Sequence, residues 1–260
     1  APQAEEGLKL ERIVITGTST ARTKMKSSVS VSTLDPEQIQ KSGAASAAEV
    51  LRSIPGIRSE SSGGEGNANM TVRGAPISAG GSRYMQLQED GLPVMLFGDV
   101  SFATADQFVR ADGMLDSVQA VRGGSASTLA TNSPAGIVNF ISKSGSVAGG
   151  SAGLTVGLDH KQARLDFDVG GRLGAKTRFQ IGGFQRIGEG PRDTNVTVEN
   201  GGQLRMNLTQ EFTGGFVRVS FKQLDDKTPT YLPVPVIRNG NKIEQIAGVD
   251  PRAAFFINSN

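Results

Sequence analysis

The sequence predicts an α+β domain over its first half and antiparallel β-strands over its second half. Three observations lead to this fold class. Glycine supplies 34 of 260 residues, against a usual share of about 7%, and glycine costs about 1 kcal/mol inside a helix, so long helices are disfavoured. Apolar residues alternate with polar ones beyond residue 150, but not before it. No stretch reaches the roughly 20 apolar residues of a membrane-spanning helix.

The composition excludes several kinds of chemistry. The chain has no cysteine and one histidine, which removes thiol catalysis, disulfides and any metal site that needs two histidine ligands. Lysine and arginine total 27 against 25 acidic residues, a net charge of +2, and this near balance gives no support to nucleic-acid binding. We therefore expect no metal, no cofactor and no nucleic-acid partner.

Two short helices are predicted in the first half. Asp35 can cap a helix that begins at Pro36 and runs through Gln40, since proline suits the first helical position. Ser46 and Glu49 have the spacing of a capping box, in which each side chain accepts a hydrogen bond from a backbone N–H group at the start of the helix. The second helix therefore begins just after Ser46.

Short strands and turns complete the first half. The predicted strands are apolar or β-branched runs next to glycine or polar loops, at residues 57–59, 70–74, 84–88, 117–122 and 137–141. Asp90-Gly91 predicts a turn in which glycine takes a positive φ. Residues 145–153 are rich in glycine and serine and predict a flexible joint.

Beyond that joint the hydrophobic period is two. The alternating apolar residues are Leu154, Val156, Leu158, Leu165, Phe167, Val169, Phe179, Ile181, Leu204, Met206, Leu208, Val217, Val219 and Phe221. This pattern is typical of outer-membrane barrel strands, and a soluble antiparallel sheet shows it too, so the pattern alone leaves both possibilities open. We count about five strands. From residue 223 the alternation is lost and prolines follow, which predicts a long loop over 223–260.

Two motifs resemble those of enzymes but lack the required context. Residues 13–18 are similar to the first strand and turn of a short-chain dehydrogenase, yet no second glycine follows to admit a pyrophosphate, and neither tyrosine has a lysine four residues later. Residues 149–153 match the Gly-x-Ser-x-Gly nucleophile pattern, with Asp159 and His160 downstream, but they lie in a linker and not between a strand and a helix. We expect no enzyme. A dehydrogenase and a non-membrane α+β binding module are the alternatives.

Residues 8–143 resemble the N-terminal plug of a TonB-dependent outer-membrane receptor. Each matching motif is weak alone, but six occur in the family's order over about half of the chain. They are Glu11–Thr16, Ala48–Leu51 with Ile54–Ile57, Thr71–Gly74, Glu89–Pro93, Asp116–Gly123 and Ala135–Lys143. The resemblance implies an α+β plug domain followed by antiparallel strands of a transmembrane β-barrel, of the type with about 22 strands.

The domains that this resemblance implies are a periplasmic tail and linker over 1–28, a plug over 29–146, and the first barrel strands with the start of an extracellular loop over 147–260. A strand needs about 9–11 residues to cross the bilayer, and an open sheet edge cannot lie in lipid. Residues 151–260 are too few to close such a barrel. We therefore expect the chain to be the N-terminal part of a longer protein.

The resemblance also implies a contact with TonB, which an inner-membrane complex energises. The implied TonB box consists of Glu11, Arg12, Ile13, Val14, Ile15, Thr16 and Gly17. An extended peptide of this kind can add as a strand to the edge of a partner's sheet, with main-chain hydrogen bonds supplying much of the affinity. The alternative is an ordinary edge strand packed on the plug, and residues 18–28 are expected to be a linker.

Arg73 and Arg122 each end a predicted strand just before a glycine. A buried guanidinium needs a carboxylate partner, because an unpaired buried charge costs several kcal/mol. The resemblance implies that both arginines face glutamates on the barrel wall and lock the plug in place. Local ion pairs within the plug are the alternative.

By the same resemblance, loops 75–83 and 96–102 face the cell exterior and contact a ligand. The candidate residues are Ser82, Arg83, Tyr84, Phe97, Gly98, Asp99 and Phe102. Arg83 suits an anionic group and the aromatic residues suit stacking, although each is equally an ordinary loop or core residue. The implied function is energised uptake of a scarce nutrient across the lipid of a Gram-negative outer membrane, with the N-terminus in the periplasm. Ferric siderophores are the commonest class, and cobalamin, haem and carbohydrates are others.

Overall fold

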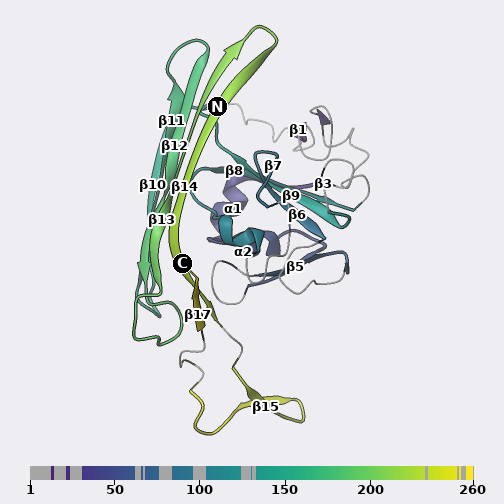
Figure 1. The fold of residues 1–260 in the computed structure, drawn as a ribbon, viewed down its shortest axis with the longest axis vertical. Helices are drawn as coiled ribbons and strands as arrows, with labels where there is room; N and C mark the ends of the chain where they lie inside the picture. Colours follow the sequence, from purple (N-terminus) through teal and green to yellow (C-terminus); the bar gives the residue numbers. More distant parts are fainter. Residues whose placement is uncertain are drawn as a thin grey trace, which may run out of the picture.

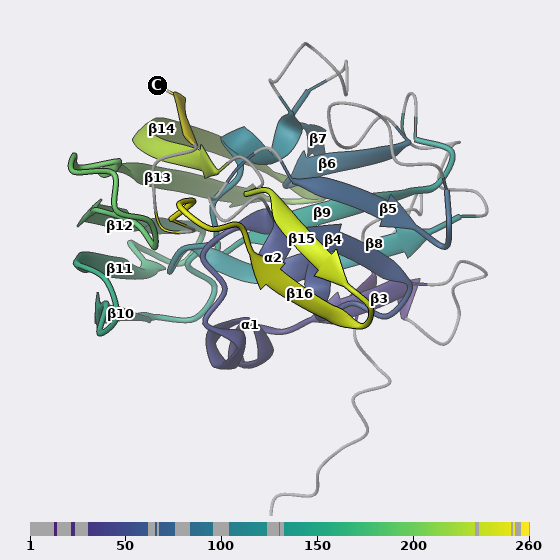
Figure 2. The same cartoon turned by 90° about the horizontal axis from the view of Figure 1, so that it is seen from below.

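The computed structural model shows two bodies, an N-terminal domain over residues 31–143 and a curved sheet that begins at residue 149 (Figure 1). The curved sheet lies along one side of the N-terminal domain in both views (Figures 1 and 2). The structure describes residues 13–14, 22–23, 31–61, 66, 68–75, 84–95, 104–123, 130, 133–231, 234–250, 252 and 256–259.

Two short helices of the N-terminal domain begin at the capping residues that the sequence predicts. Helix α1 (Pro36–Ser42) starts after Asp35, whose Oδ1 accepts from the Gln38 backbone N at 2.8 Å. The Gln38 side chain accepts in turn from the Asp35 backbone N at 3.0 Å, which completes a capping box. Helix α2 (Ala47–Arg52) starts after the second capping box, at Ser46.

A five-stranded sheet and a two-stranded sheet accompany these helices. The larger sheet has the order β3, β8, β9, β6, β7, in which β6 and β9 are parallel and the other neighbours are antiparallel. The strands are β3 (Val31–Leu34), β4 (Ile57–Glu60), β5 (Asn69–Val72), β6 (Met85–Glu89), β7 (Leu92–Pro93), β8 (Leu115–Arg122) and β9 (Gly136–Ser142). Strands β4 and β5 form the smaller sheet, and the 3-10 helix η3 (Ala105–Phe108) precedes β8.

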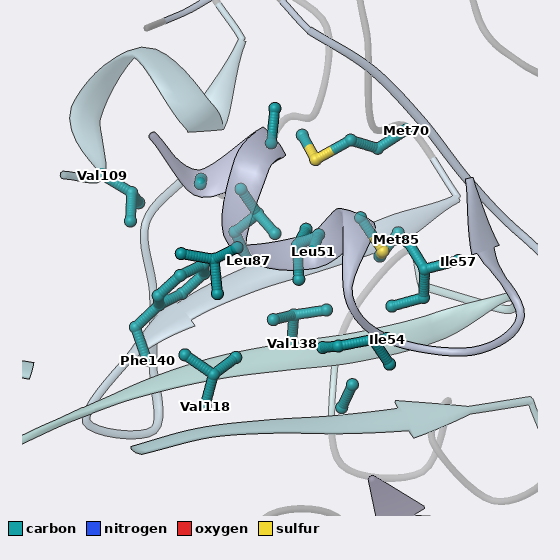
Figure 3. Packing of buried hydrophobic residues seen from close by; sticks show 14 of the residues in the cluster. Leu51, Ile54, Ile57, Met70, Met85, Leu87, Val109, Val118, Val138 and Phe140 are labelled. Carbon is teal, nitrogen blue, oxygen red and sulfur yellow. The ribbon is translucent and has the colours of Figure 1, made fainter. Parts of the chain in front are cut away.

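The hydrophobic core forms where α2 packs on the larger sheet (Figure 3). Leu51 and Ile54 lie among Leu87, Val138 and Phe140, and each of these side chains is at most 1% exposed. Burying one such side chain is worth about 1.5–3 kcal/mol. The core therefore consists of residues of the N-terminal domain alone.

The turn between β6 and β7 has the predicted form, with a positive φ at Gly91 (86°) and also at Asp90 (51°). A non-glycine residue in this conformation needs local support. Here the Asp90 carboxylate accepts from the Ser142 backbone N at 2.7 Å, and the Asn139 side chain accepts from the Gly91 backbone N at 2.9 Å. The turn is thereby tied to β9.

The curved sheet has six strands, each antiparallel to the next. They are β10 (Gly149–Val156), β11 (Gln162–Arg172), β12 (Thr177–Gly188), β13 (Glu199–Phe212), β14 (Gly215–Tyr231) and β17 (Phe256–Ser259). Between β14 and β17 the chain forms a separate hairpin of β15 (Val236–Asn239) and β16 (Lys242–Gln245).

The two faces of the curved sheet have inverted polarity. Exposed apolar side chains cover one face, among them Leu154, Leu165, Val169, Ile187, Leu208 and Val219. Buried polar side chains cover the other, among them Arg164, Asp168, Gln180, Arg186, Gln203 and Arg205. A soluble sheet buries its apolar face, whereas a membrane barrel turns that face to lipid. The sheet is therefore a piece of a barrel wall, and the soluble alternative is wrong.

Two expectations from sequence are also wrong. The predicted flexible joint at 145–153 overlaps β10, which begins at Gly149 because β11 supplies hydrogen-bonding partners for it. The loop predicted from residue 223 begins later, since β14 continues to Tyr231 through Pro229. Strand β14 pairs with β13 only as far as Lys227, so the proline lies where it has one neighbouring strand.

Among the described residues, no helix has the length and apolar character needed to cross a membrane.

Val219 tests the orientation of the curved sheet, because it lies on the apolar face of β14 and is 66% exposed. Val219→Arg is expected to lower the free energy of unfolding, since a lipid-facing strand position disfavours a charge, by up to about 2–4 kcal/mol at the bilayer midplane. The measurement is urea unfolding of the complete protein from lipid vesicles. Val219→Leu keeps the apolar surface and should leave the midpoint unchanged; an equally stable arginine variant would contradict a lipid-facing position.

Candidate functional site

The candidate site is the interface between the N-terminal domain and the polar face of the curved sheet. Residues from η3, β6 and the segment before β8 meet residues from β11 to β14 there. The contacts are hydrogen bonds and ion pairs. A buried charge without a partner is strongly destabilising, so each buried charged side chain here needs a partner at hydrogen-bonding distance.

Arg110, Asp226 and Arg186 form the most deeply buried part of this interface, with side chains that are 0–1% exposed. Arg110 lies after η3, and its Nε donates to Asp226 Oδ2 at 2.8 Å. Arg186 of β12 donates to the same carboxylate from Nε and Nη2, both at 2.8 Å. One carboxylate on β14 thus pairs with one guanidinium from each body.

The Arg110 side chain is also fixed to its own segment. Its Nη1 donates to the backbone oxygens of Gln107 at 2.8 Å, Val109 at 3.1 Å and Asp106 at 3.4 Å. The planar guanidinium suits such multiple bonding. Arg110 therefore moves only together with the segment that follows η3.

Arg164 of β11 contacts the same region of the N-terminal domain. Its Nη2 donates to the backbone oxygen of Ala111 at 2.7 Å, while Asp166 accepts from its Nε at 2.8 Å. The guanidinium lies over the Phe184 ring, 4.0 Å from the ring centroid, and Arg186 lies 5.9 Å from it. Phe184 thus supports both wall arginines by cation–π contact.

A second ion cluster lies beside the β6–β7 turn. Lys222 of β14 donates from Nζ to both carboxylate oxygens of Glu89 at 2.8 Å, and to the backbone oxygen of Phe108 at 2.5 Å. Arg205 of β13 lies 3.9 Å from Glu89 and donates to Ser142 Oγ at 2.6 Å. A cavity of about 470 Å³ adjoins this cluster, between β7 and strands β13 and β14.

Two carboxylic acids of the N-terminal domain have raised pKa values at the interface. Burial raises the pKa of Asp106, although hydrogen bonds and the charge of Arg110 act in the opposite direction. Burial also raises the pKa of Asp112, opposed first by the charge of Arg205. Gln203 of β13 donates to Asp112 Oδ2 at 2.7 Å. The cations of the curved sheet thus favour the ionised form of Asp112 at a place where burial disfavours it.

The last contact lies where the chain leaves the N-terminal domain. Lys143 Nζ is 3.1 Å from Asp168 of β11, and the Lys143 backbone oxygen accepts from Asn207 at 2.8 Å. Asp168 also accepts from Gln180 at 2.9 Å and from Ser151. The end of β9 is therefore tied directly to two strands of the curved sheet, β11 and β13. Across the described ranges, no three histidine or acidic side chains gather in a way that could hold a metal ion.

Arg73 and Arg122 lie close together in the N-terminal domain. Arg73 is exposed and has a positive φ of 49°. Arg122 is half-buried and donates to the Pro55 backbone oxygen and, at 2.7 Å, to Ser32 Oγ. Partial burial lowers the pKa of Arg122, and the nearby positive charge of Arg73 lowers it further. These contacts lie within the domain, and a glutamate partner on the barrel wall stays a prediction for both arginines.

Most of the other predicted site residues lie outside the described residues. Of the predicted TonB box, Ile13–Val14 forms β1, which pairs antiparallel with β2 (Arg22–Thr23); Glu11, Arg12, Ile15, Thr16 and Gly17 are not described. Of the predicted ligand contacts, Ser82, Arg83, Phe97, Gly98, Asp99 and Phe102 are not described.

Tyr84 is the one predicted ligand contact among the described residues. It is half-buried and precedes β6, and its backbone oxygen accepts from the Ala135 N at 2.9 Å. The position of β1 bears on the dehydrogenase alternative, which requires residues 13–15 at the centre of a parallel sheet. The antiparallel pairing of β1 with β2 excludes that arrangement.

Sequence reasoning missed the charged residues of the interface, Glu89, Arg110, Arg186, Lys222 and Asp226. A usable signal was present for the three wall residues, because charged residues at alternating positions of β12 and β14 must share the face opposite to the apolar one. Which charges pair across the interface depends on how the N-terminal domain is placed, and no sequence period carries that information.

Comparison with known proteins shows which family and which solved structures this chain is similar to. Residues 23–137 match the family model described as TonB-dependent Receptor Plug Domain. No curated protein matches the chain significantly. The chain is similar to the solved structure of P. aeruginosa FpvA bound to a heterologous pyoverdine and iron, with 16% identity, a TM-score of 0.64 and coverage of 84% of this chain and 27% of that one.

Two further solved structures are similar. The ferric-catecholate import receptor Fiu from E. coli K12 shows 17% identity and a TM-score of 0.60, covering 81% of this chain and 29% of that one. The ferric yersiniabactin uptake receptor FyuA from Yersinia pestis shows 15% identity and a TM-score of 0.57, covering 78% and 32%. This chain thus spans about a third or less of the length of these receptors.

The N-terminal domain is a plug domain, and the curved sheet is part of an outer-membrane β-barrel. Residues 23–137 thus belong to the plug-domain family of TonB-dependent receptors, and the similar solved proteins are outer-membrane receptors and transporters and not enzymes.

Arg122 offers a test of how the N-terminal domain is held together. Arg122→Met removes the donors to Pro55 and Ser32, and we expect it to lower the unfolding free energy of this domain by about 1–2 kcal/mol. Urea-dependent proteolysis of the complete receptor measures this. Arg52→Met, on an exposed arginine that bonds Ser61, is the control and should shift the midpoint less. Equal midpoints for the two variants would count against a structural role for Arg122.

Proposed function

We propose that the whole protein takes up a scarce nutrient across the outer membrane by energised transport, and that the nutrient is a ferric siderophore or a similar iron chelate. The observation that carries this proposal is the seating of a separately cored domain on the polar face of the barrel wall. A domain in this position blocks the lumen, so a solute passes only when the domain moves or rearranges. Breaking several buried ion pairs requires work, which an external energy source must supply.

The kinds of cargo bound by similar structures support the iron chelate. FpvA was solved with a pyoverdine and iron, Fiu is a ferric-catecholate import receptor, FyuA is a ferric yersiniabactin uptake receptor and FecA is a ferric citrate transporter. In this chain we assign the first ligand contacts to Ser82, Arg83, Tyr84, Phe97, Gly98, Asp99 and Phe102. Arg83 would pair with an anionic group of the chelate, and the aromatic side chains would stack on it.

We assign the contact with TonB to residues 11–17. Strand β1 pairs through two residues with β2, so little is lost when a partner strand replaces β2. The replacement would occur by strand addition, in which main-chain hydrogen bonds form along the whole peptide. Arg73 and Arg122 would form a lock with glutamates on the barrel wall, and Arg122 would do so alongside its contacts to Pro55 and Ser32 within the N-terminal domain.

Val14 tests the strand-addition contact, because proline lacks the backbone N–H group that a paired strand donates. Val14→Pro is expected to abolish energised uptake and to leave binding at the cell surface unchanged. The measurement is accumulation of ⁵⁵Fe supplied as ferric citrate, a ferric catecholate or a ferric pyoverdine, with binding measured in de-energised cells. Val14→Thr keeps the β-branched strand residue and should retain uptake. Normal uptake by the proline variant would remove the TonB assignment, and binding of none of the three chelates would remove the iron assignment.

A further inference from the structure

Asp226 is shared between the two bodies of the structure. Its carboxylate accepts from Arg110 of the N-terminal domain and from Arg186 of the curved sheet, through three hydrogen bonds of 2.8 Å. The Asp226 and Arg186 side chains are 0% exposed and that of Arg110 is 1% exposed. Because these side chains are almost inaccessible to solvent, each charge depends on the others for compensation.

A fourth charge belongs to the same region. Asp106 of η3 is 0% exposed, accepts from the Ala68 backbone N at 2.8 Å, and is close enough for the charge of Arg110 to act on it. The N-terminal domain therefore contributes Asp106 and Arg110, and the curved sheet contributes Asp226 and Arg186. Each body thus supplies one carboxylate and one guanidinium to this region.

We propose that Asp226 is a releasable counter-ion that holds residues 104–112 on strands β12 and β14. When the two bodies separate, Asp226 keeps its two hydrogen bonds from Arg186, and Arg110 keeps its backbone partners and is compensated by the nearby carboxylate of Asp106 on the same segment. Neither body is left with an uncompensated buried charge. The holding role is independent of transport, whereas the release role rests on the proposed function.

Because Asp226 is shared by two arginines, removing Arg110 and removing the Asp226 charge should have different effects on the two bodies. Removal of Arg110 leaves Asp226 paired with Arg186, so the curved sheet is unaffected and only the N-terminal segment is loosened. Removal of the Asp226 charge leaves two buried guanidiniums beside each other, so both bodies are destabilised. An ordinary two-residue salt bridge would give effects of similar size from either side.

Amide hydrogen exchange of the complete receptor in lipid nanodiscs, without TonB, tests the holding role. We expect Arg110→Met to raise exchange of residues 104–112 by roughly tenfold or more and to leave β12 and β14 unchanged. Asp226→Asn is expected to raise exchange in all three regions. Arg58→Met, on an exposed arginine paired with Glu60, is the matched control and should change none of them.

Two results would overturn the holding role. One is native exchange of residues 104–112 in Arg110→Met, which would show that Asp226 serves the curved sheet alone. The other is an equal pattern in Arg110→Met and Asp226→Asn. If Asp226→Asn does not assemble in the membrane, Arg186→Met replaces it: it should raise exchange in β12 and keep residues 104–112 protected by Arg110–Asp226, and loss of that protection would contradict the proposal.

Asp106→Asn tests the release role, because asparagine keeps an acceptor for the Ala68 N–H but removes the charge that receives Arg110. We expect native exchange in the seated state and at least a severalfold loss of energised ⁵⁵Fe uptake, with ferric citrate, a ferric catecholate and a ferric pyoverdine as probes. Native uptake by this variant would overturn the release role. Absence of uptake by the unmodified receptor would instead refute the proposed function, and the exchange results would still stand.

Discussion

The inverted polarity of the curved sheet is the constraint on which the rest of the structure depends. Because one face is apolar and meets lipid, the charged residues must lie on the other face, where Arg164, Arg186 and Arg205 are nearly inaccessible to water. Such buried charges are tolerated only where a hydrogen-bonding or oppositely charged group lies next to them. The N-terminal domain supplies partners for two of them, Glu89 for Arg205 and the backbone oxygen of Ala111 for Arg164, whereas Asp226 of the sheet itself pairs with Arg186.

The two kinds of packing in this chain suit two different tasks. The core around Leu51 and Phe140 is apolar and closely packed, and it keeps the N-terminal domain folded as a unit. The interface with the curved sheet is polar, and its hydrogen bonds define one seated orientation. Polar groups regain partners or water after separation, whereas a large apolar interface would leave hydrophobic surface exposed. A domain with an apolar core and a polar interface is therefore suited to being held firmly in one position and then moved as a unit.

Local sequence was a good guide wherever the interaction is local. The capping boxes at Asp35 and Ser46 involve residues three apart, and they formed as predicted. The errors at 145–153 and after residue 223 have a common cause. Glycine and proline weaken the sequence signal for a strand, but hydrogen bonds from a neighbouring strand can still hold such residues in one. Gly149 is held by β11, and Pro229 lies where β14 no longer pairs with β13.

By itself the sequence determined that strands with one apolar and one charged face follow an α+β domain, because alternation and capping are encoded within a few neighbouring residues. It also carried the order of motifs that marks the family of the N-terminal domain. Only the tertiary structure decided that Arg110 meets Asp226, which lies 116 residues further along the chain. Pairing over that separation depends on how two folded bodies fit together, and that fit is a property of their surfaces in space and of no local pattern.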